Sequence, residues 1–240
     1  MLMKRAFWVV KESVKYLLQL LMLKIRNGPL KGKKWIVASG IKFLSGEYEP
    51  ANTSIFLESL NKGDVLYDVG AHVGYYSLLA SNLVGPSGQT IAFEPRPLNA
   101  HYLRRHVRSN QCRNVQLVQA CVGETSGSCR FEVRTGSGTG HISRNGNMIV
   151  PIVSLDELYR EKKLPTPNFI KIDVEGAEIF VLKGSKEIIA EVRPTILVAT
   201  HGDELLGECT NFLTAMNYHI KLIDEPRLTY NRDILATPNN

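Results

Sequence analysis

Short apolar runs alternate with amphipathic stretches along most of the chain from residue 65 onward. The apolar runs have the length of buried strands, and the stretches between them have the periodicity of helices. The predicted strands are residues 65–69, 90–93, 115–119, 169–173, 195–199 and 218–223, and the predicted helices are residues 74–83, 97–110, 155–161, 177–190 and 203–216. This alternation predicts an α/β fold with a doubly wound, mostly parallel sheet, which binds ligands at the carboxyl ends of its strands.

Residues 121–153 depart from this alternation, because their pattern is β-like and irregular. Gly136, Gly138, Gly140 and Gly146 predict a loop or a hairpin tip within this segment. The same stretch carries His141. We interpret it either as a mobile loop near a ligand site or as a surface hairpin tip without a functional role.

Residues 1–34 form a basic segment at the start of the chain. Nine lysines and arginines stand against one acid, which gives +8, whereas the whole chain carries +6 and the remainder therefore carries −2. The cations gather opposite an apolar stripe on a helical wheel, so we predict an amphipathic helix that ends at Asn27-Gly28-Pro29. Its longest uncharged run, residues 16–23, is too short to span a bilayer, and charges interrupt any signal-peptide core. The helix is expected to pack on protein, to lie on a membrane surface or to cover the active site.

The location of the charge limits the classes of partner. Because the basicity belongs to one segment, no nucleic-acid groove is predicted in the domain. The four cysteines form no CxxC pair and show no metal-ligand spacing with the six histidines, so neither a zinc site nor a disulfide framework is predicted. We expect a cytoplasmic protein that contacts a membrane peripherally or self-associates through residues 1–34.

The first predicted strand leads into a glycine loop, Asp68-Val69-Gly70-Ala71-His72-Val73-Gly74. Gly70 allows a tight turn off the strand, and Gly74 allows close packing of the next helix. The middle glycine of the dinucleotide fingerprint GxGxxG would fall at His72, whose side chain obstructs a pyrophosphate. An adenosyl ligand without phosphates is therefore favoured over a dinucleotide.

Acidic residues follow two further strands. Glu94 follows the second strand at the offset expected of a carboxylate that binds both ribose hydroxyls, although it could also be an ordinary solvated glutamate. Asp173 and Glu175 follow the fourth strand in the run Ile170-Lys171-Ile172-Asp173-Val174-Glu175-Gly176. They either line a cleft or serve the next helix as an N-cap and a first-turn acid.

Together these motifs resemble the FkbM family of S-adenosylmethionine-dependent methyltransferases. The resemblance rests on DVGAHVGYYS, FEP, FIKIDVEGAE, VLKG and an upstream Tyr48-Glu49, and it covers residues 46–202. It implies a Rossmann-like class I methyltransferase domain over residues 46–240, with residues 1–45 as a helical extension. It also implies S-adenosylmethionine as the cofactor and a hydroxyl of a sugar, glycan or secondary metabolite as the acceptor.

The resemblance also assigns the cofactor site. Asp68, Gly70, Ala71 and Gly74 would shape the cofactor loop, Glu94 would hold the ribose, Glu49 would reach the methionine end, and Ala120, Cys121 and Val122 would flank the adenine. The chain departs from the family at His72, where Asn is more common, and at Thr200-His201-Gly202, which replaces the usual acid after the fifth strand.

Methyl transfer to a hydroxyl needs alignment and a base that takes the proton. Asp173, Glu175 and His201 are the candidates, because all three follow strands at the expected cleft. No metal site is predicted, although a divalent ion held by Asp173 and Glu175 stays an alternative. A non-catalytic S-adenosylmethionine-binding module and a nucleotide-dependent oxidoreductase are the competing interpretations, and His72 disfavours the second.

Overall fold

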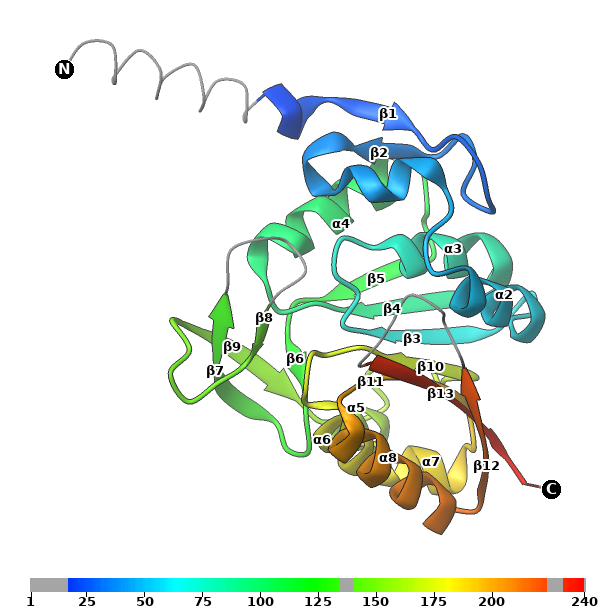
Figure 1. The fold of residues 1–240 in the computed structure, drawn as a ribbon, viewed down its shortest axis with the longest axis vertical. Coiled ribbons are helices and arrows are strands. Elements are labelled where there is room, and N and C mark those ends of the chain that lie inside the picture. The colour runs from blue at the N-terminus through cyan, green and yellow to red at the C-terminus, as the bar shows by residue number, and fades with distance from the viewer. Residues whose placement is uncertain (1–16, 134–139, 224–230, 240) are drawn as a thin grey trace.

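A seven-stranded sheet forms the centre of the computed structural model, which describes residues 17–133, 140–223 and 231–239 (Figure 1). The strand order is β12-β13-β11-β10-β3-β4-β5. The bounds are β3 (Val65–Val69), β4 (Gln89–Phe93), β5 (Val115–Val118), β10 (Phe169–Ile172), β11 (Thr195–His201), β12 (Tyr218–Ile223) and β13 (Asn231–Pro238). Neighbours from β11 to β5 are parallel, whereas β13 lies antiparallel between β11 and β12. The doubly wound, mostly parallel sheet predicted from the sequence is confirmed.

Helices cover both faces of this sheet (Figure 1). One face carries α2 (Pro50–Ser59), α3 (Tyr75–Val84) and α4 (Pro97–Ser109), and the other carries α5 (Leu155–Arg160), α6 (Glu178–Lys183), α7 (Lys186–Glu191) and α8 (Asp203–Ala215). Each layer buries its own hydrophobic cluster against the strands. The chain runs outward from β3 to β5 and then returns to β10 on the other side of β3. Such a reversal of strand order opens a crevice at the carboxyl ends of the two strands.

The single helix predicted over residues 177–190 is wrong, because the structure divides it into α6 and α7. The carbonyl of Gly184 accepts hydrogen bonds from the N–H of Asp156 (2.8 Å) and from Ser154 Oγ (3.1 Å). The Asp156 carboxylate in turn accepts from the N–H groups of Glu187 and Ile188 at the start of α7. A side chain from α5 therefore caps a new helix where the sequence pattern indicated continuity.

The N-terminal segment also differs from its prediction. Residues 17–20 are helical, but Met22–Lys24 forms β1, which pairs antiparallel with β2 (Lys34–Ile36), so the helix does not continue to Arg26. Gly28 lies in the connection between these strands at φ 69°, where a Cβ would meet the carbonyl oxygen of Gly46 at 2.1 Å. Residues 1–16 of the predicted helix lie outside the described residues.

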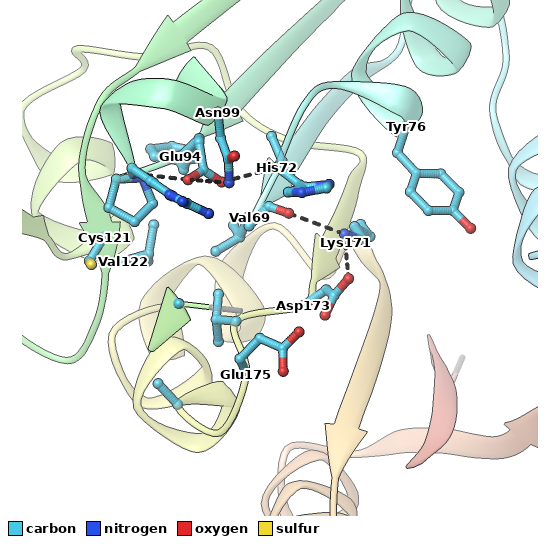
Figure 2. Close-up of a pocket in the computed structure, with 18 of the residues that line it drawn as sticks. Val69, His72, Tyr76, Glu94, Asn99, Cys121, Val122, Lys171, Asp173 and Glu175 are labelled. Carbon is cyan, nitrogen blue, oxygen red and sulfur yellow. Dashed lines mark hydrogen bonds and ion pairs between the residues drawn. The ribbon is translucent and has the colours of Figure 1, made fainter. Parts of the chain in front are cut away.

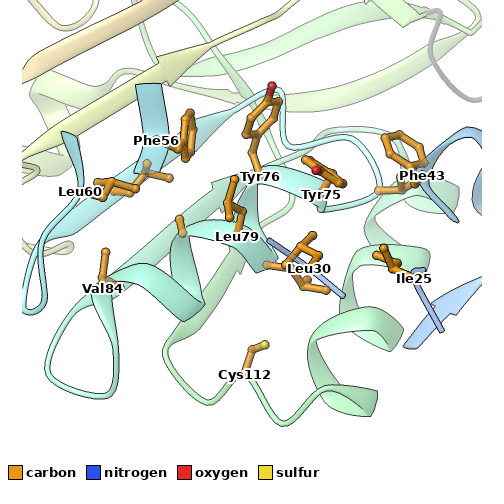
Figure 3. Close-up of a cluster of buried hydrophobic side chains, with 14 of the residues drawn as sticks. Ile25, Leu30, Phe43, Phe56, Leu60, Tyr75, Tyr76, Leu79, Val84 and Cys112 are labelled. Carbon is orange, nitrogen blue, oxygen red and sulfur yellow. The ribbon is translucent and has the colours of Figure 1, made fainter. Parts of the chain in front are cut away.

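The residues after β1 belong to the core of the domain. Ile25, Leu30 and Phe43 are buried with side chains of α2 and α3 (Figure 3). Phe43 lies in η2 (Ile41–Ser45), the second of two 3₁₀ helices that follow β2, the first being η1 (Val37–Ser39). Residues 22–45 thus contribute to the same hydrophobic cluster as the sheet, and a domain boundary at residue 45 stays a prediction.

The irregular β segment forms a second, four-stranded sheet in the order β6-β9-β7-β8. Its strands are β6 (Cys121–Val122), β7 (Gly127–Val133), β8 (Gly140–Ile142) and β9 (Met148–Val153). The glycine-rich loop lies partly outside the described residues, but its end, Gly140–Ile142, pairs with β7. Among the described residues, no helix combines the length and the apolar character needed to cross a membrane.

Candidate functional site

A cavity opens at the carboxyl ends of β3, β4 and β10, where the strand order reverses (Figure 2). Of the residues that sequence analysis assigned to a site, the cavity is lined by Gly70, Ala71, Glu94, Ala120, Cys121, Val122, Asp173 and Glu175. Residues from η2, α3 and the small sheet complete its wall, among them Phe43, Tyr76 and Phe131. The sheet therefore gathers motifs that lie a hundred residues apart in the sequence.

The loop between β3 and α3 adopts the tight turn that its glycines predict. Gly70 has φ 79°, and a Cβ there would lie 1.8 Å from the carbonyl oxygen of Asp173. Gly74 has φ 92°, and its Cβ would lie 2.8 Å from the Leu103 side chain in α4. Both positions require glycine, because the conformation and the space exclude a side chain. His72, at φ 51°, directs its side chain along the cavity wall.

Glu94 is the buried acid at the end of β4. Its carboxylate accepts hydrogen bonds from the N–H groups of His72 and Arg96, both at 2.9 Å, and from Asn99 Nδ2 at 3.3 Å. Burial raises the pKa of Glu94 to about 7, although these donors favour the charged form. Two oxygens held in place at the cavity wall can each accept a further hydrogen bond from a ligand hydroxyl. Asn99, the partner from α4, was missed by sequence analysis.

Asp68 does not line the cavity. Its side chain is completely buried beneath the glycine loop, where one oxygen accepts from Ser77 Oγ at 2.6 Å and the other lies 3.6 Å from Lys171 Nζ. Asp68 therefore stabilises the glycine loop through its contacts with Ser77 and Lys171. A direct contact of Asp68 with a cofactor remains a prediction.

Lys171 is a buried cation that sequence analysis missed. Its ammonium lies 3.2 Å from Asp173 Oδ2 and 3.5 Å from the carbonyl oxygen of Gly70, and it sits over the Tyr76 ring (Figure 2). Burial lowers the pKa of Lys171, but the carboxylates of Asp173 and Asp68 outweigh burial and hold that pKa above its usual range. The signal was a lysine between Ile170 and Ile172 in an otherwise apolar strand, where an unpaired charge is unfavourable.

Glu49 lies behind the cavity wall, at the start of α2. It has φ 41°, and its carboxylate accepts a hydrogen bond from Tyr76 Oη at 2.7 Å. Tyr48 and Tyr76 themselves line the cavity. Burial and the nearby Glu49 raise the pKa of the Tyr76 hydroxyl, which stays neutral and can donate to Glu49. Contact of Glu49 with the methionine end of a cofactor stays a prediction.

The three candidate bases lie together at the ends of β10 and β11. His201 Nε2 is 3.4 Å from Glu175 Oε2 and 3.9 Å from Asp173 Oδ1. On its other side, Nδ1 of His201 lies 2.8 Å from Oε1 of the buried Glu178, a partner that sequence analysis did not assign to the site. Burial lowers the pKa of His201, but the hydrogen bond to Glu178 and the surrounding carboxylates raise it to about 9. His201 is therefore a cation near neutral pH.

The charges in this cluster act on its carboxylates in opposite directions. Burial raises the pKa of Asp173, but Lys171 and His201 outweigh burial and hold it below its usual range. The pKa of Glu175 is raised, first by burial and then by Asp173 and Glu178, although His201 opposes the shift. Asp173, Glu175 and His201 also offer three ligand atoms within 4.8 Å of one another, which a divalent ion could use in place of the proton on His201.

The other end of the cavity is apolar. Ala120, Cys121 and Val122 form its wall after β5, and Phe131 of the small sheet stands beside them. A flat aromatic base is the kind of group that such a wall accommodates. The cavity thus combines an apolar wall, a buried carboxylate at the end of β4 and a glycine turn too tight for any Cβ. These features fit the adenosyl part of S-adenosylmethionine.

Comparisons with known proteins agree with this geometry. The family model described as "Methyltransferase FkbM domain" matches residues 68–220. The hexuronic acid methyltransferase AglP of Haloferax volcanii is 31% identical over 160 residues, which cover 65% of this chain and 64% of that protein. The 31-O-demethyl-FK506 methyltransferase FkbM of Streptomyces tacrolimicus is 24% identical over 201 residues, which cover 70% of this chain and 77% of that protein. The match to AglP thus spans less than two thirds of its length.

Solved structures support the fold. A methyltransferase FkbM from Methylobacillus flagellatus superposes with a TM-score of 0.56 at 18% identity, covering 83% of this chain and 53% of that one. Fibrillarin of Aeropyrum pernix, solved with natively bound S-adenosyl-L-methionine, has a TM-score of 0.52 at 17% identity and covers 75% and 68% of the two chains. The predicted Rossmann-like class I fold is confirmed, and so is the predicted cofactor, S-adenosylmethionine. By the match of its family model, this chain belongs to the FkbM methyltransferase family.

Proposed function

We propose that this protein transfers the methyl group of S-adenosylmethionine to a hydroxyl oxygen of a sugar, glycan or similar small-molecule acceptor. One observation carries the proposal: Glu94, Asp173 and Glu175 line the same cavity, and His201 lies beside the last two, with its Nε2 3.9 Å from Asp173 Oδ1 and 3.4 Å from Glu175 Oε2. The names of the relatives AglP and FkbM, a hexuronic acid methyltransferase and a 31-O-demethyl-FK506 methyltransferase, support a small oxygen-rich acceptor.

S-adenosylmethionine supplies a methyl group on a positively charged sulfur, which needs no protonation to leave. We propose that Glu94 accepts hydrogen bonds from the ribose hydroxyls, the glycine loop approaches the methionine part, and residues 120–122 flank the adenine. The chain must then align the acceptor hydroxyl and take its proton.

Asp173 is the base that we propose. One of its oxygens is held by Lys171 at 3.2 Å, and its side chain is partly exposed at the cavity, so the carboxylate is both oriented and accessible. His201 already carries a proton near neutral pH and can only donate, so we assign it the orientation of Asp173 and Glu175. Glu175, which has φ 57° and lines the cavity, is the residue to which we assign contact with the acceptor.

The test measures formation of S-adenosylhomocysteine with uronic acids, neutral sugars and non-sugar alcohols. We expect turnover with a sugar-type acceptor, and Asp173→Asn should lower kcat at least about a hundredfold. The affinity for S-adenosylhomocysteine should stay nearly constant in this variant, measured by calorimetry, and Asp203→Asn in the first turn of α8 serves as the control. Full turnover in Asp173→Asn would mean that another group takes the proton. Cofactor binding without product from any acceptor would instead favour a non-catalytic binding module.

A further inference from the structure

We propose that one end of this molecule docks on the surface of an anionic lipid bilayer. This end, called here the docking surface, consists of residues 17–34, which include β1 and the first residue of β2, together with the neighbouring helix α4. It lies apart from the carboxyl ends of β10 and β11, where the candidate bases gather (Figure 1). Three observations carry the proposal. The surface exposes several leucines, it carries cations but no acids, and contacts hold its two parts together.

The docking surface exposes an unusual concentration of leucine. Leu17, Leu18, Leu20, Leu21 and Leu23 are all exposed, by 62, 38, 51, 45 and 43%. Isolated exposed leucines are normal on protein surfaces, but a contiguous group marks a site that contacts a membrane or another protein. Five such side chains lie within seven consecutive residues, which is a dense local grouping of exposed leucine.

The same surface carries cations without a single acid. Residues 17–34 contribute Lys24, Arg26, Lys31, Lys33 and Lys34, and α4 contributes Arg104, Arg105 and Arg108. Neither segment contains aspartate or glutamate. Eight positive charges here exceed the net charge of +6 of the whole chain, so the rest of the protein carries −2. The positive charge is therefore a local property of this end of the molecule.

Packing fixes the two parts of the docking surface to each other. Arg105 Nη1 of α4 donates to the carbonyl oxygen of Gln19 at 2.5 Å, and the N–H of Lys34 donates to Asn110 Oδ1 at 2.8 Å. Trp35 of β2 stacks on His106 of α4 with ring centroids 4.0 Å apart. These contacts hold the segment with the leucines against the helix with the arginines.

The combination of leucine and cations identifies the partner. A nucleic acid would pair with the cations but would leave the leucines in water. A second copy of this chain could cover the leucines but would bring eight like charges against eight. An anionic bilayer satisfies both groups, because leucines enter the boundary of headgroups and acyl chains while lysines and arginines meet anionic headgroups.

The experiment compares the full chain on vesicles of phosphatidylcholine alone and on vesicles that also contain phosphatidylglycerol, by co-sedimentation at low and high salt. We expect binding to the anionic vesicles alone, and weaker binding at high salt because ions screen the attraction. Equal binding to both vesicle types, or no binding to either, would overturn the proposal.

Two variants separate the contribution of the leucines from that of the arginines. The leucine variant combines Leu17→Ser, Leu20→Ser and Leu21→Ser, and the arginine variant combines Arg104→Gln and Arg108→Gln. Each should weaken binding to anionic vesicles at least about tenfold. The matched control is Leu222→Ser with Lys221→Gln, two exposed residues on β12, which should bind like the unchanged chain. Thermal unfolding and S-adenosylhomocysteine affinity, unchanged in every variant, would show that fold and cofactor site are intact.

Three outcomes would contradict the docking surface. Undiminished vesicle binding in both variants would assign the attraction to another segment, such as residues 1–16. A dimer detected by light scattering that the leucine variant dissociates, without vesicle binding, would identify a second copy as the partner. Displacement from vesicles by an RNA oligonucleotide that binds the leucine variant equally well would point to nucleic acid.

Discussion

Glu94 shows how a single buried carboxylate can control ligand binding. Three donors orient its two oxygens, while burial raises its pKa to about 7. The carboxylate is the form that accepts two further hydrogen bonds from a ribose, whereas the protonated acid offers one oxygen as a donor. If Glu94 binds the ribose as we propose, the protonation of this one side chain decides whether the site is prepared for its ligand.

The affinity for S-adenosylhomocysteine should therefore depend on pH. Above pH 7 Glu94 is charged, and the affinity should be constant. Below pH 7 binding must displace a proton from Glu94, so the affinity should fall by up to about tenfold for each pH unit. Glu94→Gln should bind at least about tenfold more weakly at high pH, because it loses a charge-assisted acceptor, and should lack this dependence. Calorimetry across the range tests this, with the exposed Glu124→Gln as the control. A flat profile for the unchanged chain would contradict the role of Glu94.

Lys171 should matter for stability as well as for the site. Replacing it by Met leaves Asp68 and Asp173 facing each other without their shared cation. The loss of one partner from a buried ion pair costs about 3 kcal/mol or more in free energy of unfolding. Urea unfolding measures the loss, and the exposed Lys62→Met should change stability by less than about 0.5 kcal/mol. Equal stability of the two variants would refute this account of Lys171.

At the scale of elements, the division between α6 and α7 depends on a side chain from a third helix. Asp156 of α5 accepts from the N–H groups of Glu187 and Ile188, at 2.9 and 3.1 Å. These are two of the donors that a helix start leaves without a partner inside the helix. The cap therefore joins α5 to α7 and terminates the helix that Glu178 begins.

Removing this cap should destabilise the protein by about 1–2 kcal/mol. Asp156→Ala takes away the acceptor and leaves two N–H groups in a buried position. Asp203→Ala removes an exposed acid from the first turn of α8 and should cost much less, since it changes only the interaction with the helix dipole. Chemical unfolding of both variants provides the comparison, and a similar cost for the two would exclude capping by Asp156.

The elements that could be predicted from the sequence are those in which the pattern of apolar residues matches their burial in the folded protein. Strands β3 and β10 are buried on both faces, so their apolar runs stand out. The cap on α7 escaped detection because its acceptor lies about thirty residues upstream. Residues 231–238 contain too few apolar positions to predict a strand, and only pairing with β11 and β12 reveals β13.

Tertiary contacts decided the remaining differences. The helical period through Arg26 is real in the sequence, but pairing of Met22–Lys24 with Lys34–Ile36 replaces the helix there. At the site, the glycines, Glu94 and the acids after β10 could be predicted because strand ends converge in this fold. Lys171 and Glu178 could not be assigned, since their importance depends on partners brought together by folding.

At the scale of the whole molecule, the residues that precede the seven-stranded sheet in the chain are part of the hydrophobic core. Trp35 is fully buried and stacks on His106, whose pKa burial lowers to about 4, so that a neutral ring can accept a hydrogen bond from the N–H of Ile36 at 3.0 Å. Phe43 packs against Trp35 at 4.8 Å between ring centroids and also lines the cavity. Phe43 therefore connects Trp35 of the N-terminal hairpin to the wall of the cavity.

Trp35→Ala should cost about 3–5 kcal/mol of free energy of unfolding, because it leaves a large cavity in this cluster. Ile41→Ala, at a position that is 72% exposed, should change stability little. Removal of residues 1–45 should prevent folding of the remainder, because it also removes Trp35 and the core side chains around it. Circular dichroism would show the loss of secondary structure. A folded, cofactor-binding product of that truncation would instead confirm residues 46–240 as an independent domain.

The position of β13 has a consequence for how the protein is made. Asn231–Pro238 lies inside the sheet, and its backbone supplies the hydrogen bonds that β11 and β12 need on their facing edges. While a ribosome is still synthesising residues before 231, a chain that has begun to fold presents the edge of β11 unpaired. An open strand edge is a template for pairing with other chains, so the nascent protein should depend on chaperones until these eight residues emerge.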